Sequence, residues 1–187
     1  MKDKISRREM LRKSALASAL TLIGTPLAQG LGHAQGAATP PADLEKLPQV
    51  PRRVLGKTGE TIPILLLGMA MKLDPRFDPK LAEALRFGVN YYDAADCYGR
   101  GTCEPALGSY LEKAGNRKDL WITSKSDAHS PAGFEATLND GLQKMKTDYV
   151  DMYFLHALQD ESVFTKDLQS TVERLKKEKK IRFFGFS

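Results

Sequence analysis

Four side chains of the kind that move protons follow three apolar segments of the chain. Asp93 and Tyr98 come after residues 90–92, which have the composition of a strand end, and Lys125 and His156 each end a later apolar segment. Any one of them alone is more often a surface or half-buried residue than a catalytic one. Because all four stand at the carboxyl ends of predicted strands, we expect them to form one proton-transfer site.

The elements that position these residues recur about every thirty residues, the length of a strand–helix unit. Apolar segments predict strands at residues 64–68, 90–94, 120–124, 151–155 and 183–187. Between them, helical patterns cover Pro79–Phe87, a segment capped by Thr102 and ended by Gly115, a segment opened by Ser130-Pro131, and Lys166–Lys179. A Gly-containing turn at residues 56–59 also predicts a hairpin within Arg53–Pro63. This alternation is typical of a parallel sheet with right-handed crossovers.

Two α/β architectures share that alternation, a doubly wound sheet and a (β/α)8 barrel. Gly68-Met69-Ala70-Met71 follows the first strand in place of a G-x-G-x-x-G turn, which disfavours the doubly wound dinucleotide fold. Reactive side chains at the ends of three strands favour the (β/α)8 TIM barrel. Such a barrel needs about 250 residues, so we expect only about the first five strand–helix units to be present.

The first 34 residues have the composition of a cleaved export signal. Met1–Ser14 is basic, Ala15–Ala28 is apolar and small, and small residues precede a cleavage site near Ala34. Ser6–Arg12 resembles a twin-arginine signal, with an ordinary export signal as the alternative. The apolar run is too short to span a bilayer. We expect export by the twin-arginine machinery to the bacterial periplasm, no permanent membrane anchor, and a linker at residues 35–52.

Charge and cysteine content narrow the classes of function. Six of the 28 Lys and Arg residues and only two of the 23 acidic residues lie in the leader, so most of the net charge of +5 lies there. Because the rest of the chain carries little net positive charge, the composition does not favour nucleic-acid binding. Cys97 and Cys103 could pair in an oxidising compartment, and their spacing does not decide this. With no second cysteine pair for a tetrahedral site, we expect neither a disulfide nor a metal.

Several motifs, in order and spacing, resemble the aldo/keto reductase family. They are Gly88-Val-Asn-Tyr-Tyr-Asp-Ala-Ala-Asp-Cys-Tyr-Gly99, Glu104-Pro-Ala-Leu-Gly108, Ile122-Thr-Ser-Lys125, Tyr149-Val-Asp-Met-Tyr-Phe-Leu-His156 and Lys180-Ile-Arg-Phe-Phe-Gly-Phe-Ser187. The resemblance covers residues 53–187. It implies a (β/α)8 barrel, a nicotinamide cofactor (usually NADPH, with NADH as the alternative), and reduction of a small-molecule aldehyde or ketone.

The resemblance also assigns roles to the four residues. Tyr98 would donate the proton, Lys125 would assist it, Asp93 would hold Lys125 charged and oriented, and His156 would orient the carbonyl. A free tyrosine, with a pKa of about 10, is a reluctant acid near neutral pH, and an ammonium beside a phenol eases proton donation. The nominated cofactor contacts are Gly68, Met69, Asp93 and Ser187.

The sequence also departs from the family pattern. The family continues past Ser187 with strand–helix units that hold the nicotinamide and the 2′-phosphate. An alternative is therefore a non-catalytic fragment that keeps the catalytic tetrad (Asp93, Tyr98, Lys125 and His156) without the full cofactor site. A more remote alternative is a regulatory module. An apolar final strand without a neighbour would allow self-association. Lys179 stands where a glycine often ends a helix, a strain of about 1 kcal/mol if its backbone is left-handed.

Overall fold

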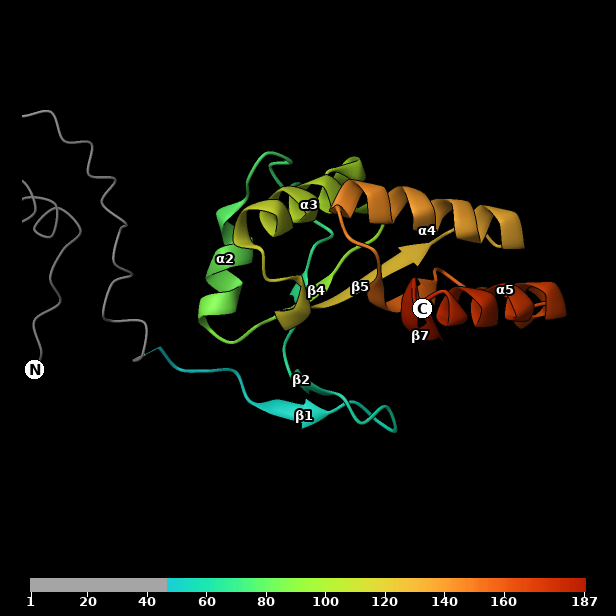
Figure 1. Cartoon of the computed structure of the whole chain (residues 1–187), viewed down its shortest axis with the longest axis horizontal. Helices are drawn as coiled ribbons and strands as arrows, with labels where there is room; N and C mark the ends of the chain where they lie inside the picture. Colours follow the sequence, from blue (N-terminus) through green and yellow to red (C-terminus); the bar gives the residue numbers. More distant parts are fainter. Residues whose placement is uncertain (1–46) are drawn as a thin grey trace, which may run out of the picture. The chain divides into compact units, whose positions relative to one another are not determined.

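The computed structural model of the protein describes residues 47–187. The predicted leader at residues 1–34 and the linker residues 35–46 lie outside this range. β1 (Arg52–Val54) and β2 (Thr61–Pro63) form an antiparallel hairpin, which confirms the predicted turn, and five further strands form one parallel sheet (Figure 1). Among the described residues, no helix has the length and apolarity needed to cross a membrane.

Strands and helices alternate through the rest of the chain, as the sequence predicts. The parallel strands are β3 (Leu67–Gly68), β4 (Tyr91–Asp93), β5 (Trp121–Ser126), β6 (Val150–Leu155) and β7 (Ile181–Phe186). The helices are α2 (Pro79–Arg86), α3 (Cys103–Ala114), α4 (Pro131–Met145) and α5 (Lys166–Lys177). Short 3₁₀ turns are η2 (Tyr98–Gly101), η3 (Arg117–Asp119) and η4 (Glu161–Val163).

The prediction of a buried strand at 64–68 is wrong for its first half. Ile64, Leu65 and Leu66 are 50%, 58% and 46% exposed, and only Leu67–Gly68 pairs with β4. The Ile64 N–H donates to Pro51 O at 2.9 Å, so this end of the apolar run continues the hairpin instead of joining the parallel sheet.

The order of the parallel strands disfavours the doubly wound alternative. The strands lie side by side as β3-β4-β5-β6-β7, without the reversal that defines a doubly wound sheet. Right-handed crossovers between successive neighbours bring the connecting helices to one face of a sheet, as in the wall of a (β/α)8 barrel. Within residues 47–187 the sheet is open and not closed into a barrel.

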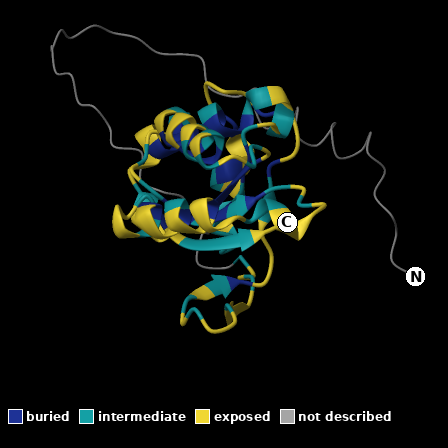
Figure 2. Cartoon of the chain, turned by 90° about the vertical axis from the view of Figure 1, so that its right-hand side faces the viewer, coloured by how far each residue is buried: buried dark blue, intermediate teal, exposed yellow. Residues whose placement is uncertain are grey.

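The core lies between the sheet and the helices that cover it, where Figure 2 shows the buried residues. From the sheet, Tyr92, Ile122 and Tyr153 contribute fully or nearly fully buried side chains. The predicted helix stripes are confirmed as buried: Phe134, Leu138, Leu142 and Met145 on α4, and Leu168, Val172 and Leu175 on α5. Removing these apolar side chains from water is the main stabilising contribution, at about 25 cal/mol per Å².

Helix ends agree with the sequence at most positions. Ser130 Oγ accepts the N–H of Gly133 at 3.2 Å, and Gly115 ends α3 with φ 63°. Thr102 is the N-cap residue of α3, as predicted, but its side chain does not cap the helix, because its hydroxyl donates to Gly99 O at 2.8 Å and accepts no N–H from the first turn of α3.

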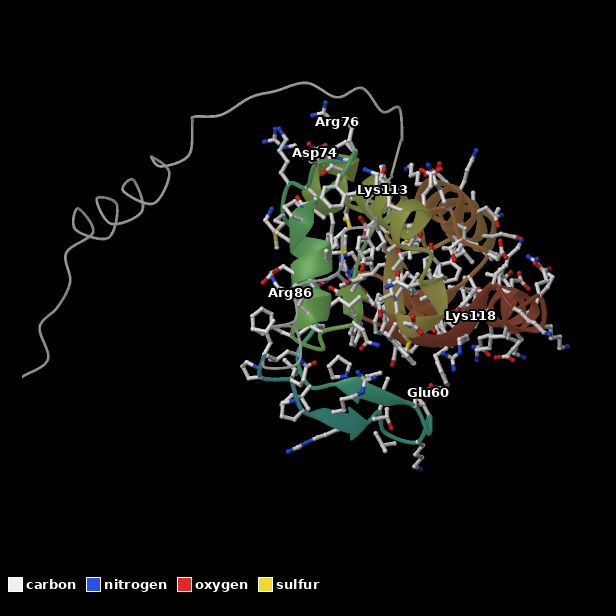
Figure 3. The ribbon with its side chains drawn as sticks, turned by 60° about the vertical axis from the view of Figure 1, so that its left-hand side comes forward. Glu60, Asp74, Arg76, Arg86, Lys113 and Lys118 are labelled. Carbon is white, nitrogen blue, oxygen red and sulfur yellow. The ribbon has the colours of Figure 1, made fainter. Side chains whose placement is uncertain are left out.

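The long connection from β3 to α2 is held against α3. Ser109 Oγ donates to Pro75 O at 2.6 Å, and Lys113 Nζ donates to Arg76 O at 3.1 Å. Figure 3 shows Asp74, Arg76 and Lys113 gathered at this end of the molecule. These contacts fix the loop that follows β3, which lies at the carboxyl edge of the sheet.

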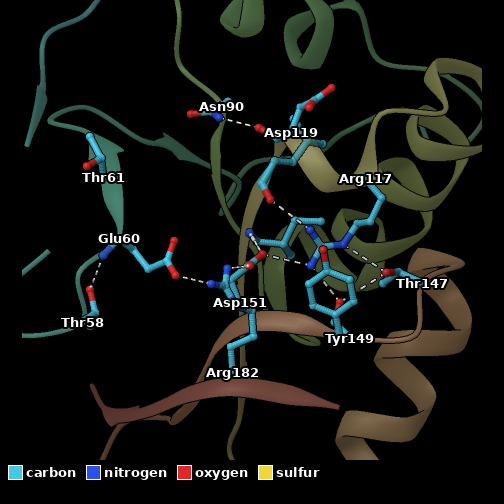
Figure 4. A network of polar contacts seen from close by, with 12 residues as sticks. Thr58, Glu60, Thr61, Asn90, Arg117, Asp119, Thr147, Tyr149, Asp151 and Arg182 are labelled. Carbon is cyan, nitrogen blue, oxygen red and sulfur yellow. Dashed lines mark hydrogen bonds and ion pairs between the residues drawn. The ribbon is translucent and has the colours of Figure 1, made fainter. Parts of the chain in front are cut away.

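At the opposite edge, Asp151 joins three strands at their amino ends (Figure 4). Its carboxylate, 2% exposed, accepts the Ile122 N–H at 2.9 Å, Arg117 Nη2 at 2.9 Å and Arg182 Nη1 at 2.7 Å. Arg182 also pairs with Glu60 in the hairpin. Since β5, β6 and β7 each contribute a member, this network stabilises the sheet away from the proposed site.

Lys179 has φ 61°, which confirms the left-handed backbone expected after α5. We predict that Lys179→Gly raises the free energy of unfolding by about 1 kcal/mol, because glycine adopts this conformation without a Cβ clash. The backbone bonds of the turn, such as Lys180 N–H to Leu175 O at 3.0 Å, would remain. Denaturant unfolding measures the change. Lys177→Gly, at the last residue of α5, is the matched control and should destabilise, because this residue has a helical backbone. A loss of stability in both variants would contradict the prediction.

Candidate active site

The structure brings the four predicted residues together at the carboxyl edge of the sheet. Asp93 ends β4, Tyr98 begins η2, Lys125 lies near the end of β5, and His156 directly follows β6. Because β4, β5 and β6 are neighbours in the parallel sheet, residues that follow them meet at one edge.

A short ion pair in the site joins Lys125 to Asp93. Lys125 Nζ lies 2.6 Å from Asp93 Oδ1 and donates to Ala94 O at 2.9 Å, and the residue is only 5% exposed. A buried ammonium without a partner is costly, so the carboxylate and the carbonyl are what allow the charge to remain there. The pair holds a positive charge at a fixed point beside Tyr98.

The Tyr98 ring contacts both that charge and His156. Lys125 Nζ is 4.4 Å from the centre of the Tyr98 ring, so in this structure the ammonium faces the ring. The Tyr98 and His156 rings are 6.0 Å apart and meet edge to face at 80°. Among the contacts of residues 47–187, none uses the phenolic oxygen of Tyr98 in a hydrogen bond, which leaves the hydroxyl available to a ligand.

The backbone at Gly99 positions Tyr98. Gly99 has φ 59°, and a Cβ there would lie 2.4 Å from Met71 O and 2.7 Å from Thr102 Oγ1. Only glycine allows so close an approach, which brings the loop after β4 against the loop after β3. An open pocket of about 510 Å³ lies beside this contact, lined by Ala70, Lys72, Gly99, Arg100 and Thr102.

The nominated cofactor residues occupy different surroundings. Gly68 ends β3 opposite Asp93, and a Cβ there would meet nothing within 4 Å. The Met69 side chain is fully buried in the core, so only its backbone could meet a ligand. Ser187 Oγ lies 2.6 Å from His156 Nδ1, so its hydroxyl contacts a member of the tetrad.

Cys97 and Asp127 lie beside His156, a neighbourhood that the sequence interpretation did not predict. One ligating atom each from Cys97, Asp127 and His156 lie within 4.8 Å of one another. Burial, then the carboxylates of Asp127 and Asp96, raise the pKa of the exposed Cys97 thiol. The position of Asp127 directly after β5 could have predicted this neighbourhood, because residues that follow neighbouring parallel strands lie close together at the same edge of the sheet.

Both cysteines are free thiols in the structure. Cys103 lies in the first turn of α3 and is fully buried, and this burial raises its pKa to about 12. It therefore contributes to the core as a small apolar residue and lies apart from the exposed Cys97.

Glu104 is a buried acid in the first turn of α3. It is 2% exposed, Ser124 Oγ donates to its Oε1 at 2.9 Å, and its Oε2 has no partner among the described residues. Burial raises the pKa of this carboxyl. The protonated Glu104 carboxyl therefore adds to the free energy of unfolding. This contribution is fully present below the carboxyl pKa of the unfolded chain, about 4.3, and is lost as the pH rises through the raised pKa of the folded protein.

We predict that Glu104→Gln stabilises the protein at pH 7–8, by about 1 kcal/mol, because the neutral amide keeps the Ser124 bond without a buried charge. The difference should vanish near pH 4, where the native carboxyl is protonated. Thermal unfolding across pH measures both curves. Glu112→Gln, at an exposed position, is the control and should show no such gain. A difference in stability between wild type and Glu104→Gln that is the same at every pH would contradict the prediction.

Comparison with known proteins agrees with this fold. The Aldo/keto reductase family matches residues 75–187. An uncharacterized oxidoreductase of Bacillus subtilis, YqkF, is 34% identical over 121 residues, which are 57% of this chain and 38% of that protein. The NADP(+) aldo-keto reductase yakc of Schizosaccharomyces pombe is 25% identical over 158 residues, which are 74% of this chain and 45% of that protein.

A solved structure gives the same result for the fold. The holo form of aldo-keto reductase AKR11C1 from Bacillus halodurans matches with a TM-score of 0.64 and 28% identity, over 74% of this chain and 50% of that one. The chain therefore spans half or less of the length of each of these three proteins. Since the family match covers more than half of its residues, the chain belongs to the aldo/keto reductase family.

Proposed function

We propose that this site reduces an aldehyde or ketone to an alcohol with NADPH as the hydride donor, NADH being the alternative. The observation that carries the proposal is the arrangement of Asp93, Lys125, Tyr98 and His156, in which a buried ion pair stands beside a phenol and an imidazole. The family membership and the relative named as an NADP(+) enzyme support the same reaction.

The chemistry divides between the cofactor and the protein. A bound nicotinamide supplies the hydride that reaches the carbonyl carbon, while the carbonyl oxygen gains negative charge and needs a proton. Tyr98 Oη donates that proton, and the Lys125 ammonium nearby stabilises the phenolate that remains. Asp93 keeps Lys125 charged and in place. His156, whose Nδ1 contacts Ser187 Oγ, has its Nε2 left to hold the carbonyl oxygen.

The residues present fit the reacting end of such a cofactor. The space beside Gly68 is open, and it lies next to Asp93 at the carboxyl edge where the tetrad gathers. The basic residues Lys72 and Arg100 line the neighbouring pocket. Gly68, the backbone of Met69, Asp93 and Ser187 would hold the nicotinamide. By the family resemblance, its 2′-phosphate would be held by strand–helix units of the barrel other than the five described here.

A second candidate is a fragment that keeps the tetrad without holding the cofactor. The observations that favour it are the open sheet and the span of half or less of the relatives' length. In that case the five strands are the front part of a (β/α)8 barrel, and the edge of β7 is where the remaining units or a second copy of the chain would pair. Size-exclusion chromatography with light scattering would distinguish a dimer from a monomer.

NADPH oxidation by the purified chain, followed by absorbance over a panel of aldehydes and ketones, tests the first candidate against the second. The expected result is carbonyl-dependent oxidation that saturates with substrate. Saturable NADPH binding without oxidation of any carbonyl would contradict the reductase, and the absence of binding would support the fragment.

We also propose that residues 1–34 direct export to the periplasm through the twin-arginine machinery. Replacing Arg7 and Arg8 by lysine should block export while leaving the folded protein intact, because the paired guanidinium groups carry the motif. Cell fractionation of both forms measures this. Equal export of the two would indicate an ordinary signal.

A further inference from the structure

Cys97, Asp127 and His156 come from the ends of three neighbouring strands. Cys97 lies in the loop after β4, Asp127 directly follows β5, and His156 directly follows β6. The His156 N–H donates to Ser126 O at 2.9 Å, which ties the last two positions together through the backbone. Ser126 Oγ accepts the Ala128 N–H at 3.1 Å, so the turn that carries Asp127 is itself fixed.

The three side chains form a mixed sulfur, oxygen and nitrogen donor set. Their ligating atoms lie within 4.8 Å of one another, and Cys97 and Asp127 are exposed. Around a tetrahedral Zn²⁺, with bonds of about 2.0–2.3 Å, neighbouring donors are about 3.3–3.8 Å apart. Rotating the side chains of the two exposed residues, so that their donor atoms move by about 1 Å, would bring the donors to the spacing of a zinc site without moving the strands.

The surroundings of His156 also suit a metal ligand. Ser187 Oγ contacts its Nδ1 at 2.6 Å, which orients the ring and leaves Nε2 to bind. An outer partner on one ring nitrogen is the usual arrangement for a metal-binding histidine. The carboxylate of Asp96, whose Oδ1 accepts the Cys97 N–H at 2.7 Å, adds negative charge beside the three donors.

We propose that Cys97, Asp127 and His156 bind one Zn²⁺ ion with an open fourth position, and that bound zinc inhibits the reaction. The inhibition rests on the proposed function, whereas the binding does not. Zinc on His156 would remove the nitrogen that holds the carbonyl oxygen and would fill the space in front of Tyr98. Inhibition should therefore be competitive with the carbonyl substrate.

A cobalt titration of the purified full chain tests the binding. Co²⁺ bound to a thiolate gives a near-ultraviolet charge-transfer band that oxygen and nitrogen ligands do not give. We expect this band in the wild-type chain and its displacement by one equivalent of Zn²⁺. Cys97→Ser should abolish the band, and Asp127→Asn should weaken Co²⁺ binding at least tenfold. The chain has only two cysteines, and Cys103 is buried, so the band reports on Cys97.

Asp96→Asn is the matched control, because it removes a neighbouring charge without removing a ligand, and it should keep the band. Circular dichroism checks the fold of each variant, and Cys97→Ala replaces Cys97→Ser if the latter is misfolded. No thiolate band in the wild type, or a band unchanged in Cys97→Ser, would overturn the site. If zinc raised the apparent KM equally in wild type and Cys97→Ser, the inhibition would be overturned. Failure of the proposed function would instead show as no NADPH oxidation in any sample, with the cobalt band intact.

Discussion

Replacing Tyr98 by phenylalanine is expected to lower the rate of carbonyl reduction by about 10²–10⁴-fold while leaving NADPH affinity nearly unchanged. The substitution removes only the hydroxyl that donates the proton. The ring would keep its position over Lys125 Nζ, 4.4 Å away, and its edge-to-face contact with His156. Because the hydroxyl bonds to no other described residue, stability should not fall. Steady-state kinetics together with a nucleotide titration measure the two effects separately.

Tyr91→Phe is the matched control for this experiment. Its hydroxyl accepts the Thr123 hydroxyl at 3.1 Å and, among the described contacts, bonds to none of Asp93, Tyr98, Lys125 and His156, so its loss should leave turnover unchanged. Equal losses of turnover and of NADPH binding in Tyr98→Phe would mean that Tyr98 holds the cofactor in place of supplying the proton. Unchanged turnover would remove Tyr98 from the reaction altogether.

The second large effect is on stability. Asp151→Ala should lower the free energy of unfolding by about 3–5 kcal/mol, because it leaves half-buried guanidinium groups and the Ile122 N–H without their shared acceptor. Denaturant unfolding followed by circular dichroism measures it. The site lies at the opposite edge of the sheet, so the folded fraction should bind nucleotide with unchanged affinity.

Asp148→Ala removes an exposed carboxylate three residues away and serves as the control, with an expected change within about 0.5 kcal/mol. If Asp151→Ala were no more destabilising than this control, the network in Figure 4 would be a surface arrangement of little consequence. Reduced nucleotide affinity in folded Asp151→Ala would show instead that the two edges of the sheet are coupled.

The alternation of strands and helices was predictable because it rests on local patterns. The stripe from Phe134 to Met145 has helical spacing and is buried as expected, and Ser130 and Gly115 act at helix ends through bonds and angles within a few residues. The strained Lys179 was predictable for the same reason. The tetrad was predictable through the family resemblance, and the structure places its four members at one edge.

Features that depend on contacts between distant segments were not predictable in this way. Ile64–Leu66 is apolar enough for a buried strand, yet its backbone follows the hairpin. Thr102 is a good capping residue by type, but the approach of Gly99 to Met71 takes its hydroxyl away from the helix. The donors around His156 and the partners of Asp151 come from different strands, and the strand order alone makes them neighbours.

An NADPH titration of the purified chain, followed by the fluorescence of the nucleotide, tests most directly whether this edge of the sheet is a nicotinamide-dependent reductase site. The predicted result is saturable binding with a Kd in the micromolar range, within the span of KM values usual for enzymes. Carbonyl substrates should then displace no nucleotide. The absence of binding at millimolar NADPH would contradict the proposed function and leave the tetrad of this chain without the cofactor its chemistry requires.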